Sequence, residues 1–377
     1  MKKLLSVILL VAMLAVPFNG TVFADDSQEK EDYLVMFDGP AYNGLLNAFG
    51  VEGGDVVNEY ELLDVAHLEL TSDQADGLSN HPHIEHLEKN AEAHKVNQTT
   101  PYGIDQVQAT EAQNQGHTGE GVDVAVLDTG IDASHEDLAA NVQGGHSVFD
   151  DAENSDPYND GDGHGTHVAG TVAAANNDTG VVGVAPQANL YAVKVLGNDG
   201  SGSYAGIAEG IEWSINNGMD VVNMSLGGPT SSPILEEFAD LANEEGLLVV
   251  AAAGNSGSSL GWFDTVNYPA KYDSVMAVGA VDENNNRPSF SSTGPAVEIA
   301  APGVDTLSTV PGNDYASLSG TSMASPHVAG VAASVWAEKS DLSNDELRQL
   351  LKDTAVDLGN EDHYGAGLVQ VLDALNQ

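Results

Sequence analysis

Four polar side chains stand where acyl chemistry could be done: an acid, an imidazole, an amide and a hydroxyl, at Asp128, His164, Asn255 and Ser322. Two of them follow short apolar runs, and the other two begin predicted helices. A serine hydroxyl becomes a good nucleophile when a base such as histidine takes its proton. A buried carboxylate would fix the tautomer of that imidazole and stabilise its cation. The combination predicts acyl transfer, with the Asn255 amide and the Ser322 N–H as donors to the tetrahedral oxyanion.

Ser322 lies in the segment Gly320-Thr-Ser-Met-Ala-Ser-Pro-His-Val-Ala-Gly330, which reads as a helix start with Pro326 just inside it. The first four N–H groups of a helix have no partner within it, so we expect a proline at the fifth position to remove little or nothing. The free N–H groups and the helix dipole favour negative charge beside Ser322. For this residue alone, an ordinary N-cap is the alternative. The other three residues argue against it, because all four lie at the proper ends of their elements.

The elements that must position these side chains alternate along the chain from about residue 118. Strands buried on both faces of a parallel sheet read as β-branched, apolar runs, and such runs occupy residues 121–128, 190–196, 220–226, 247–253 and 274–281. Predicted helices occupy residues 164–175, 204–217, 233–245 and 322–338. We predict an α/β fold with an open, doubly wound, mainly parallel sheet and helices on both faces. Function is then expected at the carboxyl ends of the strands.

The N-terminal region has the features of a secretory signal. Residues 1–24 carry a basic start, a short apolar core and small residues before Ala24. A membrane anchor would need about 20 apolar residues, and no run of that kind occurs elsewhere in the sequence. We therefore expect an exported protein without a membrane anchor.

A small module is predicted between the signal and the main domain. Strand-like segments at residues 33–37 and 55–70, the latter broken near Leu63-Asp64, flank a helical segment at 41–49. A polar joint follows at residues 90–100, and such exposed joints are usual sites of proteolytic cleavage. The pattern predicts a small α+β module. The three parts expected are a signal peptide at 1–24, this module at 25–96 and the main domain at 97–377.

Charge and composition exclude several classes of protein. The 377 residues carry 57 acidic and 11 basic side chains, a formal charge of −46. Nucleic acid and anionic membranes are therefore not expected as partners, because both need a basic face. The sequence has 0 cysteines, so no disulfide stabilises the exported chain. Stability must come from a large core or from bound ions.

Three longer segments resemble the catalytic motifs of the subtilisin family: Asp-Thr-Gly at 128–130, His-Gly-Thr-His at 164–167 and Gly-Thr-Ser-Met-Ala-Ser-Pro-His at 320–327. Their order, Asp then His then Ser, is also the subtilisin order. The similarity runs from about Asn97 to the C-terminus and is to the secreted, bacilli-type subtilisins. It implies a secreted, monomeric serine endopeptidase of broad specificity for polypeptides, with a preference for large apolar residues before the cleaved bond. Residues 33–96 resemble the family's propeptide, a chaperone and inhibitor removed by self-cleavage, here expected after Val96.

The same resemblance assigns a substrate groove. Residues 225–228 would form one wall of the main specificity pocket, and residues 252–254 the other. Glycines in the first wall permit close approach of a backbone, and an extended peptide could pair with such edges as an added strand. Asn267 lies where the family commonly has glycine at the pocket floor, which predicts a shorter or more polar pocket. The residues assigned are Ser225, Leu226, Gly227, Gly228, Ala252, Gly254 and Asn267, with Tyr204 and Ile207 in a second, apolar pocket.

The resemblance also implies bound Ca²⁺. A strong site would use side-chain oxygens of Gln98 and Asn177, the Asp137 carboxylate, and the backbone carbonyls of Ala175, Thr179 and Val181. About six oxygens around a flexible loop suit this ion. A weaker site would use the carbonyls of Ala270, Tyr272 and Val275, with Glu298 as its carboxylate. The longer glutamate side chain leaves that second site open.

Alternative functions fit the sequence less well. A lipase or esterase would need a second glycine in Gly320-Thr-Ser-Met-Ala324 and a different order of the catalytic residues. His164 and His167 could form a zinc pair, but the sequence offers no cysteine and no evident third ligand, and a zinc site needs at least three protein ligands. His167 is therefore expected to be a packed helix histidine. An inactive relative that serves as a binding module is disfavoured because all four catalytic positions are intact.

Two further clusters are interpreted as solvated. The acidic stretch at residues 156–161 has Tyr158 at its third position and no closing glutamate, so we expect a solvated loop rather than a calcium-binding EF-hand. His81, His83 and His86 lack a completing ligand pattern and are expected in a solvated turn rather than a metal site.

The charge of the main domain predicts tolerance of salt. From Asn97 onward the chain has 40 acidic and 6 basic side chains, a formal charge of −34. Self-repulsion on this scale destabilises a compact state in dilute buffer, and salt screens it. The alternative is that the charge serves solubility alone.

Overall fold

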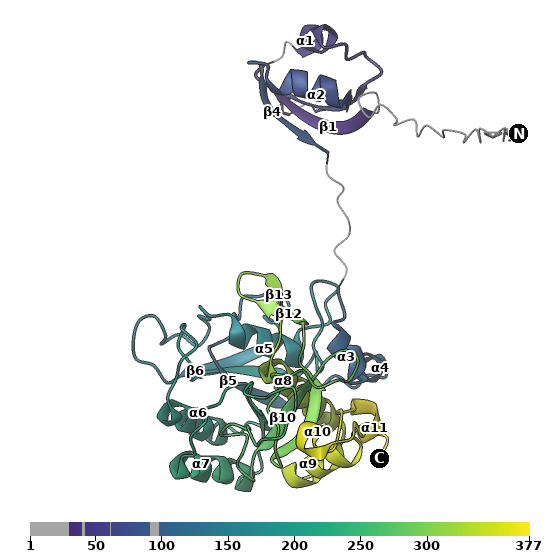
Figure 1. Cartoon of the computed structure of the whole chain (residues 1–377). Helices are drawn as coiled ribbons and strands as arrows, with labels where there is room; N and C mark the ends of the chain where they lie inside the picture. Colours follow the sequence, from purple (N-terminus) through teal and green to yellow (C-terminus); the bar gives the residue numbers. More distant parts are fainter. Residues whose placement is uncertain (1–29, 40–41, 61, 91–97) are drawn as a thin grey trace, which may run out of the picture. The chain divides into compact units, whose positions relative to one another are not determined.

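The computed structural model of this protein describes residues 30–39, 42–60, 62–90 and 98–377 (Figure 1). The chain forms two compact units, residues 1–95 and 96–377. The expected signal peptide and the expected cut after Val96 lie outside the described residues. No helix in the described ranges is long and apolar enough to cross a membrane.

The first unit is an antiparallel sheet with two helices, and its strand order is β2-β3-β1-β4. Alternate residues of the central strands, such as Val35 and Leu68, are fully buried and pack on Leu78 from a helix. This is the α+β arrangement expected from the sequence, with one helix (α2) and one strand (β4) that were not predicted. The elements are β1 (Lys30–Phe37), α1 (Tyr42–Ala48), β2 (Val56–Tyr60), β3 (Val65–Thr71), α2 (Ser72–Ser79) and β4 (Ile84–Lys89).

The second unit is built on a 7-stranded sheet with the order β11-β10-β9-β8-β5-β7-β6, in which every neighbouring pair is parallel. The chain starts in the middle at β5, fills one side with β6 and β7, and then crosses to the other side with β8 to β11. This reversal places a crevice at the carboxyl ends of β5 and β8, the usual ligand site of such sheets. The strands are β5 (Asp123–Asp128), β6 (Val142–Ser147), β7 (Asn189–Lys194), β8 (Val221–Met224), β9 (Leu248–Ala252), β10 (Met276–Val281) and β11 (Val297–Pro302).

Helices cover both faces of this sheet, as predicted. Side chains alternate between the faces of a strand, so Val124 and Val126 of β5 enter one hydrophobic core while Ala125 and Leu127 enter the other. The first core is closed by α5 (His164–Ala173), α8 (Thr321–Glu338), α9 (Asn344–Asp353) and the shorter helices α3 (Tyr102–Gln106), α4 (Ala109–Asn114) and α11 (Val371–Leu375). The second is closed by α6 (Tyr204–Asn216) and α7 (Pro233–Glu244), which lie side by side in Figure 1.

Several elements were not predicted. The strand β6 has the sequence Val-Gln-Gly-Gly-His-Ser and lies at the edge of the sheet, where one side needs no partner and apolar residues are not required. The strand β11, the hairpin β12 (Thr306–Val310) and β13 (Asp314–Leu318), and the helices α3, α4, α9, α10 (Glu361–Tyr364) and α11 were also missed. The five predicted strands and four predicted helices all form, with bounds shifted by one or two residues at most of their ends.

Candidate active site

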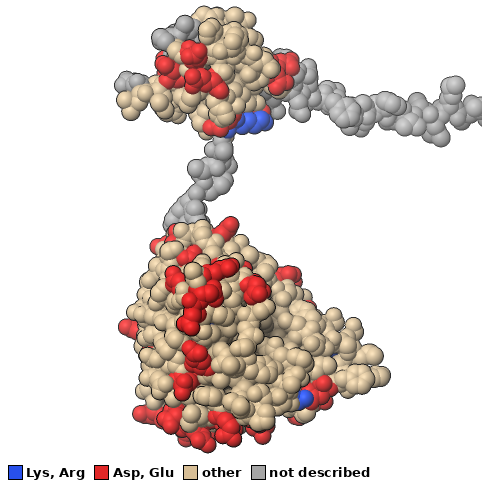
Figure 2. Space-filling model, turned by 90° about the vertical axis from the view of Figure 1, so that its left-hand side faces the viewer, with Lys and Arg blue, Asp and Glu red and all other residues tan. Residues whose placement is uncertain are grey.

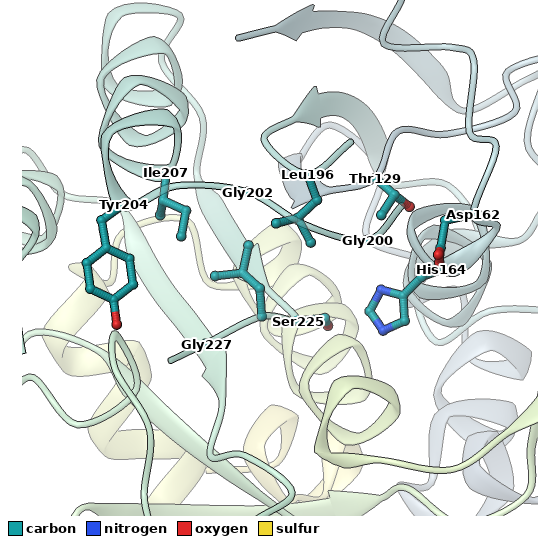
Figure 3. Close-up of a pocket in the computed structure, with 11 residues that line it drawn as sticks. Thr129, Asp162, His164, Leu196, Gly200, Gly202, Tyr204, Ile207, Ser225 and Gly227 are labelled. Carbon is teal, nitrogen blue, oxygen red and sulfur yellow. The ribbon is translucent and has the colours of Figure 1, made fainter. Parts of the chain in front are cut away.

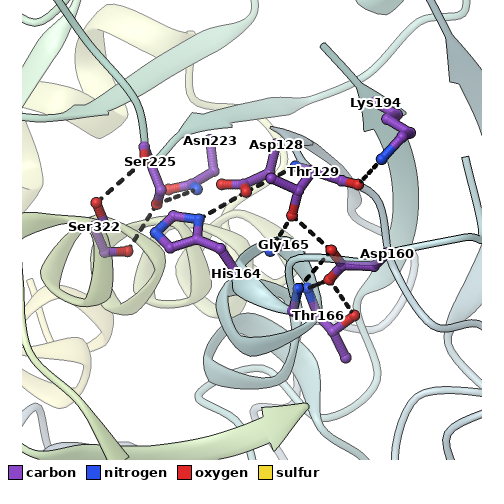
Figure 4. Close-up of polar contacts among 11 residues, drawn as sticks. Asp128, Thr129, Asp160, His164, Gly165, Thr166, Lys194, Asn223, Ser225 and Ser322 are labelled. Carbon is purple, nitrogen blue, oxygen red and sulfur yellow. Dashed lines mark hydrogen bonds and ion pairs between the residues drawn. The ribbon is translucent and has the colours of Figure 1, made fainter. Parts of the chain in front are cut away.

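Asp128 and His164 form a close pair at the carboxyl edge of the sheet. Asp128 is the last residue of β5 and is fully buried, and its Oδ1 lies 2.7 Å from His164 Nδ1. The same Oδ1 accepts the backbone N–H of Thr129 at 2.8 Å. A carboxylate bound to Nδ1 leaves Nε2 as the nitrogen that can accept a proton. Figure 4 shows the imidazole between Asp128 and Ser322.

The start of α5 is fixed by a second carboxylate, Asp160. It accepts hydrogen bonds from the N–H of Gly163 at 2.8 Å and from the N–H and hydroxyl of Thr166 at 2.8 and 2.6 Å. It also accepts the Thr129 hydroxyl at 2.8 Å, which joins the helix start to the end of β5 (Figure 4). An acceptor here satisfies N–H groups that have no partner inside the helix. Asp160 therefore holds the turn that carries His164.

The close approach of α5 to β5 requires a glycine directly after His164. A Cβ at Gly165 would lie 2.1 Å from the carbonyl oxygen of Gly130 and 3.1 Å from Cβ of Asp128. No side chain fits in that space. The glycine lets the first turn of the helix lie against the strand end, and so brings the imidazole to the carboxylate.

Ser322 is the second residue of α8, after the N-cap Gly320, so it is not itself the N-cap. Its hydroxyl donates to the carbonyl of Ser225 at 3.1 Å, and no hydrogen bond joins it to His164 in the described structure. Catalytic hydrogen bonds are often unformed without substrate. A rotation about χ1 would be needed to turn the hydroxyl toward the imidazole.

The prediction about Pro326 was wrong. The helix begins at Thr321, one residue earlier than expected, so the proline is its sixth residue. Its missing N–H would have bonded to the carbonyl of Ser322, four residues earlier. That carbonyl instead accepts the hydroxyl of Ser225 at 2.8 Å. The proline thus frees an acceptor in the first turn, and a side chain from beyond β8 uses it to hold the loop against the helix.

The amide of Asn255 is held in one orientation. Its Oδ1 accepts the N–H of Thr321 at 2.9 Å and the hydroxyl of the same residue at 3.1 Å. The Thr321 hydroxyl also accepts the N–H of Gly254 at 3.0 Å. With the oxygen of the amide occupied, the NH₂ group is the part of Asn255 left to donate to a ligand at the tip of α8.

The electrostatics of His164 follow from its neighbours. Burial lowers the pKa of this imidazole, but the charge and the hydrogen bond of Asp128 outweigh burial and raise the pKa to about 9. The negative charges of Asp162 and Asp160 act in the same direction. The cationic form of the imidazole is therefore stabilised.

The walls of the expected specificity pocket come together. Gly228 pairs with Tyr268 as an antiparallel bridge, which brings residues 225–228 beside Asn267. A Cβ at Gly227 would lie 3.2 Å from Cβ of Asn267, and one at Gly254 would lie 2.8 Å from its Nδ2. The Asn267 side chain therefore lies between the two walls, in the space that glycine would leave open.

A second cavity of about 340 Å³ begins at His164 and runs along the surface (Figure 3). Tyr204, Ile207 and Leu226 line it, and Tyr204 donates its hydroxyl to the carbonyl of Thr230 at 2.7 Å. Asp162 lines its other end, next to the imidazole. Asp162 was not predicted as a site residue, although it lies only two positions before the histidine that begins a predicted helix.

Comparisons with known proteins decide the family. The sequence model of the Subtilase family matches residues 119–367. The chain belongs to the subtilase family. It is 47% identical over 372 residues to M-protease of Shouchella clausii, which covers 95% of this chain and 94% of that protein. A thermostable alkaline protease of Halalkalibacterium halodurans is 50% identical over 347 residues, 91% of each chain, and subtilisin E of Bacillus subtilis is 47% identical over 356 residues, 94% of this chain and 88% of that protein.

The subtilase is accordingly a serine endopeptidase, with the α/β fold expected from its sequence.

The histidines outside the Asp128–His164 pair have other surroundings. His167 is fully buried, and its Nε2 lies 3.0 Å from the carbonyl of Thr306, while burial lowers its pKa to about 4. It is the packed histidine that was expected. Among the described residues, no three His, Cys, Asp or Glu side chains gather as a metal site. His81 and His83 lie in the expected turn, but the expectation of a turn was wrong for His86, which lies in β4.

The residues expected to hold Ca²⁺ in the strong site lie together in this subtilase. The amide nitrogen of Gln98 donates to the carbonyls of Ala175 at 2.6 Å and Val181 at 2.9 Å, and lies 3.4 Å from Oδ1 of Asn177. Oxygens that converge on one point suit a hard cation. Asp137 is fully buried beside them and accepts the N–H of Val181 at 2.9 Å. Turned over, the Gln98 amide would present its oxygen, so these residues fit the ion.

The residues of the expected weaker site are already engaged. The guanidinium of Arg348 binds both carboxylate oxygens of Glu298 and donates to the carbonyl of Val275 at 3.1 Å. Lys352 lies 3.4 Å from the same carboxylate. The carbonyls of Ala270 and Tyr272 are left without their carboxylate partner. As they stand, these groups do not fit a second Ca²⁺, because two side-chain cations take its place.

The acidic loop at residues 156–161 was only partly understood from the sequence. Asp156 is exposed and accepts the N–H of Tyr158 at 2.9 Å, as a solvated turn does. Asp160 is 6% exposed, so the expectation of a solvated loop was wrong for this residue. Lys194 at the end of β7 was also missed: it is fully buried and bonds to the carbonyl of Thr129 and to Oδ1 of Asn198. The Thr129 partner lies 31 residues from Asp160 and 65 from Lys194 in the sequence, so no local pattern identifies either contact.

Proposed function

We propose that this subtilase is a secreted endopeptidase in which Asp128, His164 and Ser322 form a catalytic triad. The observation that carries the proposal is the pair of Asp128 and His164, which lies at the tip of the helix that bears Ser322 (Figure 4). The buried carboxylate holds the Nδ1–H tautomer of the imidazole and leaves Nε2 to act as the base. A positively charged helix start favours the alkoxide that forms when Ser322 loses its proton.

Acylation begins when the Ser322 hydroxyl turns from the Ser225 carbonyl toward His164. Nε2 takes the hydroxyl proton while Oγ bonds to the carbonyl carbon of the substrate. The tetrahedral intermediate then collapses: the C–N bond breaks, and the leaving amine takes the proton from Nε2. Water repeats the sequence on the acyl-enzyme, giving its proton to His164 and releasing the acid and the free Ser322 hydroxyl.

The oxyanion of each intermediate is stabilised by the NH₂ group of Asn255 and the N–H of Ser322. Thr321 fixes the amide before the substrate arrives, so the donors need no reorganisation during the reaction. Loss of one such donor costs about 10²–10³ in kcat, a magnitude known from mutagenesis of the corresponding asparagine of a subtilisin. The same loss is expected for Asn255→Ala.

Substrate is bound as an extended peptide between residues 225–228 and residues 252–254. The side chain before the cleaved bond enters the pocket that Asn267 partly fills. We propose broad specificity with a preference for large apolar residues, restricted in length by the asparagine. Tyr204 and Ile207 contact a side chain farther from the bond. The enzyme acts as a monomer on polypeptides, with no nucleic acid partner and no membrane anchor.

Maturation is proposed to be self-cleavage. Residues 1–24 act as the export signal, and residues 25–96 act as a chaperone and transient inhibitor that is cut off after Val96. Calcium in the strong site, held by Gln98, Asp137, Asn177 and their neighbours, stabilises the mature enzyme outside the cell. It takes no part in the chemistry.

The decisive experiment compares the wild type with Ser322→Ala, expressed as full precursors. The wild type should hydrolyse casein and convert to a shorter chain whose N-terminus is Asn97 or within about two residues of it. The variant should be inactive and keep its precursor size. An active, processed variant would end the proposal, and an inactive wild type would do so as well.

A further inference from the structure

The cavity beside His164 has two chemically different ends (Figure 3). Tyr204 and Ile207 lie at the far end and are mostly apolar. Asp162 and His164 lie at the near end, where the carboxylate of Asp162 faces the backbone of Gly200: a Cβ there would lie 3.3 Å from its Oδ2. A ligand that fills the cavity therefore meets apolar surface at one end and a negative charge at the other.

The carboxylate of Asp162 has no structural partner among the described residues. Its side chain is exposed, and within the described residues it makes no hydrogen bond and no ion pair. The buried cation Lys194 bonds instead to the Thr129 carbonyl and to Asn198. Asp160 differs, because its four hydrogen bonds use it fully as a structural acceptor. The charge of Asp162 is thus available to a ligand.

The geometry of an extended peptide assigns one residue to each end. Successive side chains of a strand point to opposite faces, and residues two apart share a face at about 6.5 Å. If the side chain before the cleaved bond enters the pocket at Asn267, the preceding side chain faces the other way, beside His164. The fourth residue before the cleaved bond shares a face with the second, so its side chain points toward Tyr204. The near end of the cavity therefore receives the residue immediately before the one in the Asn267 pocket.

We infer that Asp162 selects substrates with lysine or arginine at the second residue before the cleaved bond. This inference rests on the proposed function, since it places the substrate by the position of Ser322. An ammonium or guanidinium group on a long aliphatic stem can reach the carboxylate while its stem covers Leu196, which also lines the cavity. The negative charge of the whole domain attracts the same side chains.

The test uses three peptides with phenylalanine directly before the cleaved bond. They differ only at the second residue before that bond, which is lysine, glutamine or glutamate. Wild-type kcat/KM should follow the order Lys, Gln, Glu. In Asp162→Asn the Lys/Glu ratio should fall about fivefold, as expected for a partly exposed ion pair that is replaced by a neutral group of equal size. Asp162→Lys should reverse the order. The ratio at one pH is independent of the protonation of His164, because both peptides meet the same free enzyme.

Asp341→Asn is the matched control, because it removes the same charge from an exposed position after α8. It should leave the Lys/Glu ratio unchanged. In the wild type, about 1 M NaCl should reduce the ratio, since the Debye length falls to about 3 Å. An equal ratio in wild type and Asp162→Asn would overturn the inference alone. Failure of the wild type to cleave any of the three peptides would overturn the proposed function and this inference with it.

Discussion

The protonation state of one residue, His164, sets the pH range of the proposed chemistry. Only the neutral imidazole can take the Ser322 proton, and Asp128 raises the pKa of His164 to about 9. We therefore expect kcat/KM to rise from neutral pH and to level off only above pH 9. The measurement is the initial rate at low peptide concentration across the range, at constant ionic strength. A plateau that is complete by about pH 7 would contradict the assignment.

The Asp128–His164 pair also affects the stability of the fold, and this contribution falls with rising pH whereas kcat/KM rises. The pKa of His164 is raised on folding above its ordinary value of 6.5, so the charged pair stabilises the fold fully below that pH. This stabilisation is lost as the pH rises through about 9. Urea unfolding of Ser322→Ala, with and without Asp128→Asn, should show a pH-dependent difference that is greatest on the acid side. A difference that grows with pH would be the wrong sign.

At the scale of elements, the first turn of α5 depends on Asp160. Asp160→Ala would leave four donors without their acceptor at a buried site. We expect a loss of about 2–4 kcal/mol in the free energy of unfolding, and a fall in activity because this turn carries His164. Urea unfolding in the Ser322→Ala background measures the first effect without self-digestion.

Two variants of the same loop sharpen the comparison. Asp160→Asn keeps the shape and one acceptor oxygen, so it should cost less than Asp160→Ala. Asp156→Ala removes an exposed carboxylate that accepts a single N–H, from Tyr158, and should change stability by about 0.5 kcal/mol or less. Equal losses at the two positions would show that burial of Asp160 is not what matters.

The loop after α5 is the element that calcium is proposed to stabilise. A chelator should speed thermal inactivation, because an ion bound only by the native state stabilises it by about 4 kcal/mol at 1,000 times its Kd. Asp137→Asn should inactivate at the faster rate with or without calcium. The control is Asp178→Asn, an exposed residue of the same loop whose positive φ of 68° asparagine tolerates well. If a chelator does not change the inactivation rate of the wild type, calcium does not stabilise this enzyme.

At the scale of the whole molecule, the acidic surface governs the response to salt. Figure 2 shows acidic side chains spread over the visible face of the second unit, with few basic ones. Of its 6 basic residues, Lys194 is buried, and Lys271, Arg348 and Lys352 already lie in ion pairs. Few cations remain to offset a formal charge of −34.

We therefore expect the melting temperature of Ser322→Ala to rise between low and molar NaCl, with calcium held constant. Salt screens the repulsion among exposed carboxylates, and at about 1 M the Debye length is only about 3 Å. Wild-type activity should persist in the same brine. A melting temperature and an activity that both decline steadily as NaCl is added would favour solubility as the sole role of the charge.

The sequence by itself determined the parallel core of the sheet and the four residues of the proposed chemistry. Central parallel strands are buried on both faces, so their apolar runs are visible without a structure. Asp128 and Asn255 follow such runs, while His164 and Ser322 begin predicted helices. The order of elements then places all four at one edge of the sheet. The edge strand β6 lacks this signal, because an edge needs neither apolar faces nor two partners.

Only the tertiary structure decided what lies around these residues. Asp160 and Asp162 stand two positions apart in one acidic loop, yet the first is buried against Thr129 and Thr166 while the second faces an open cavity. Their difference depends on groups brought in from other parts of the chain. The same holds for Arg348, which lies 50 residues from Glu298 and fills the place expected for a second cation. Desolvation and hydrogen bonding act between neighbours in space, and a local sequence pattern contains no record of them.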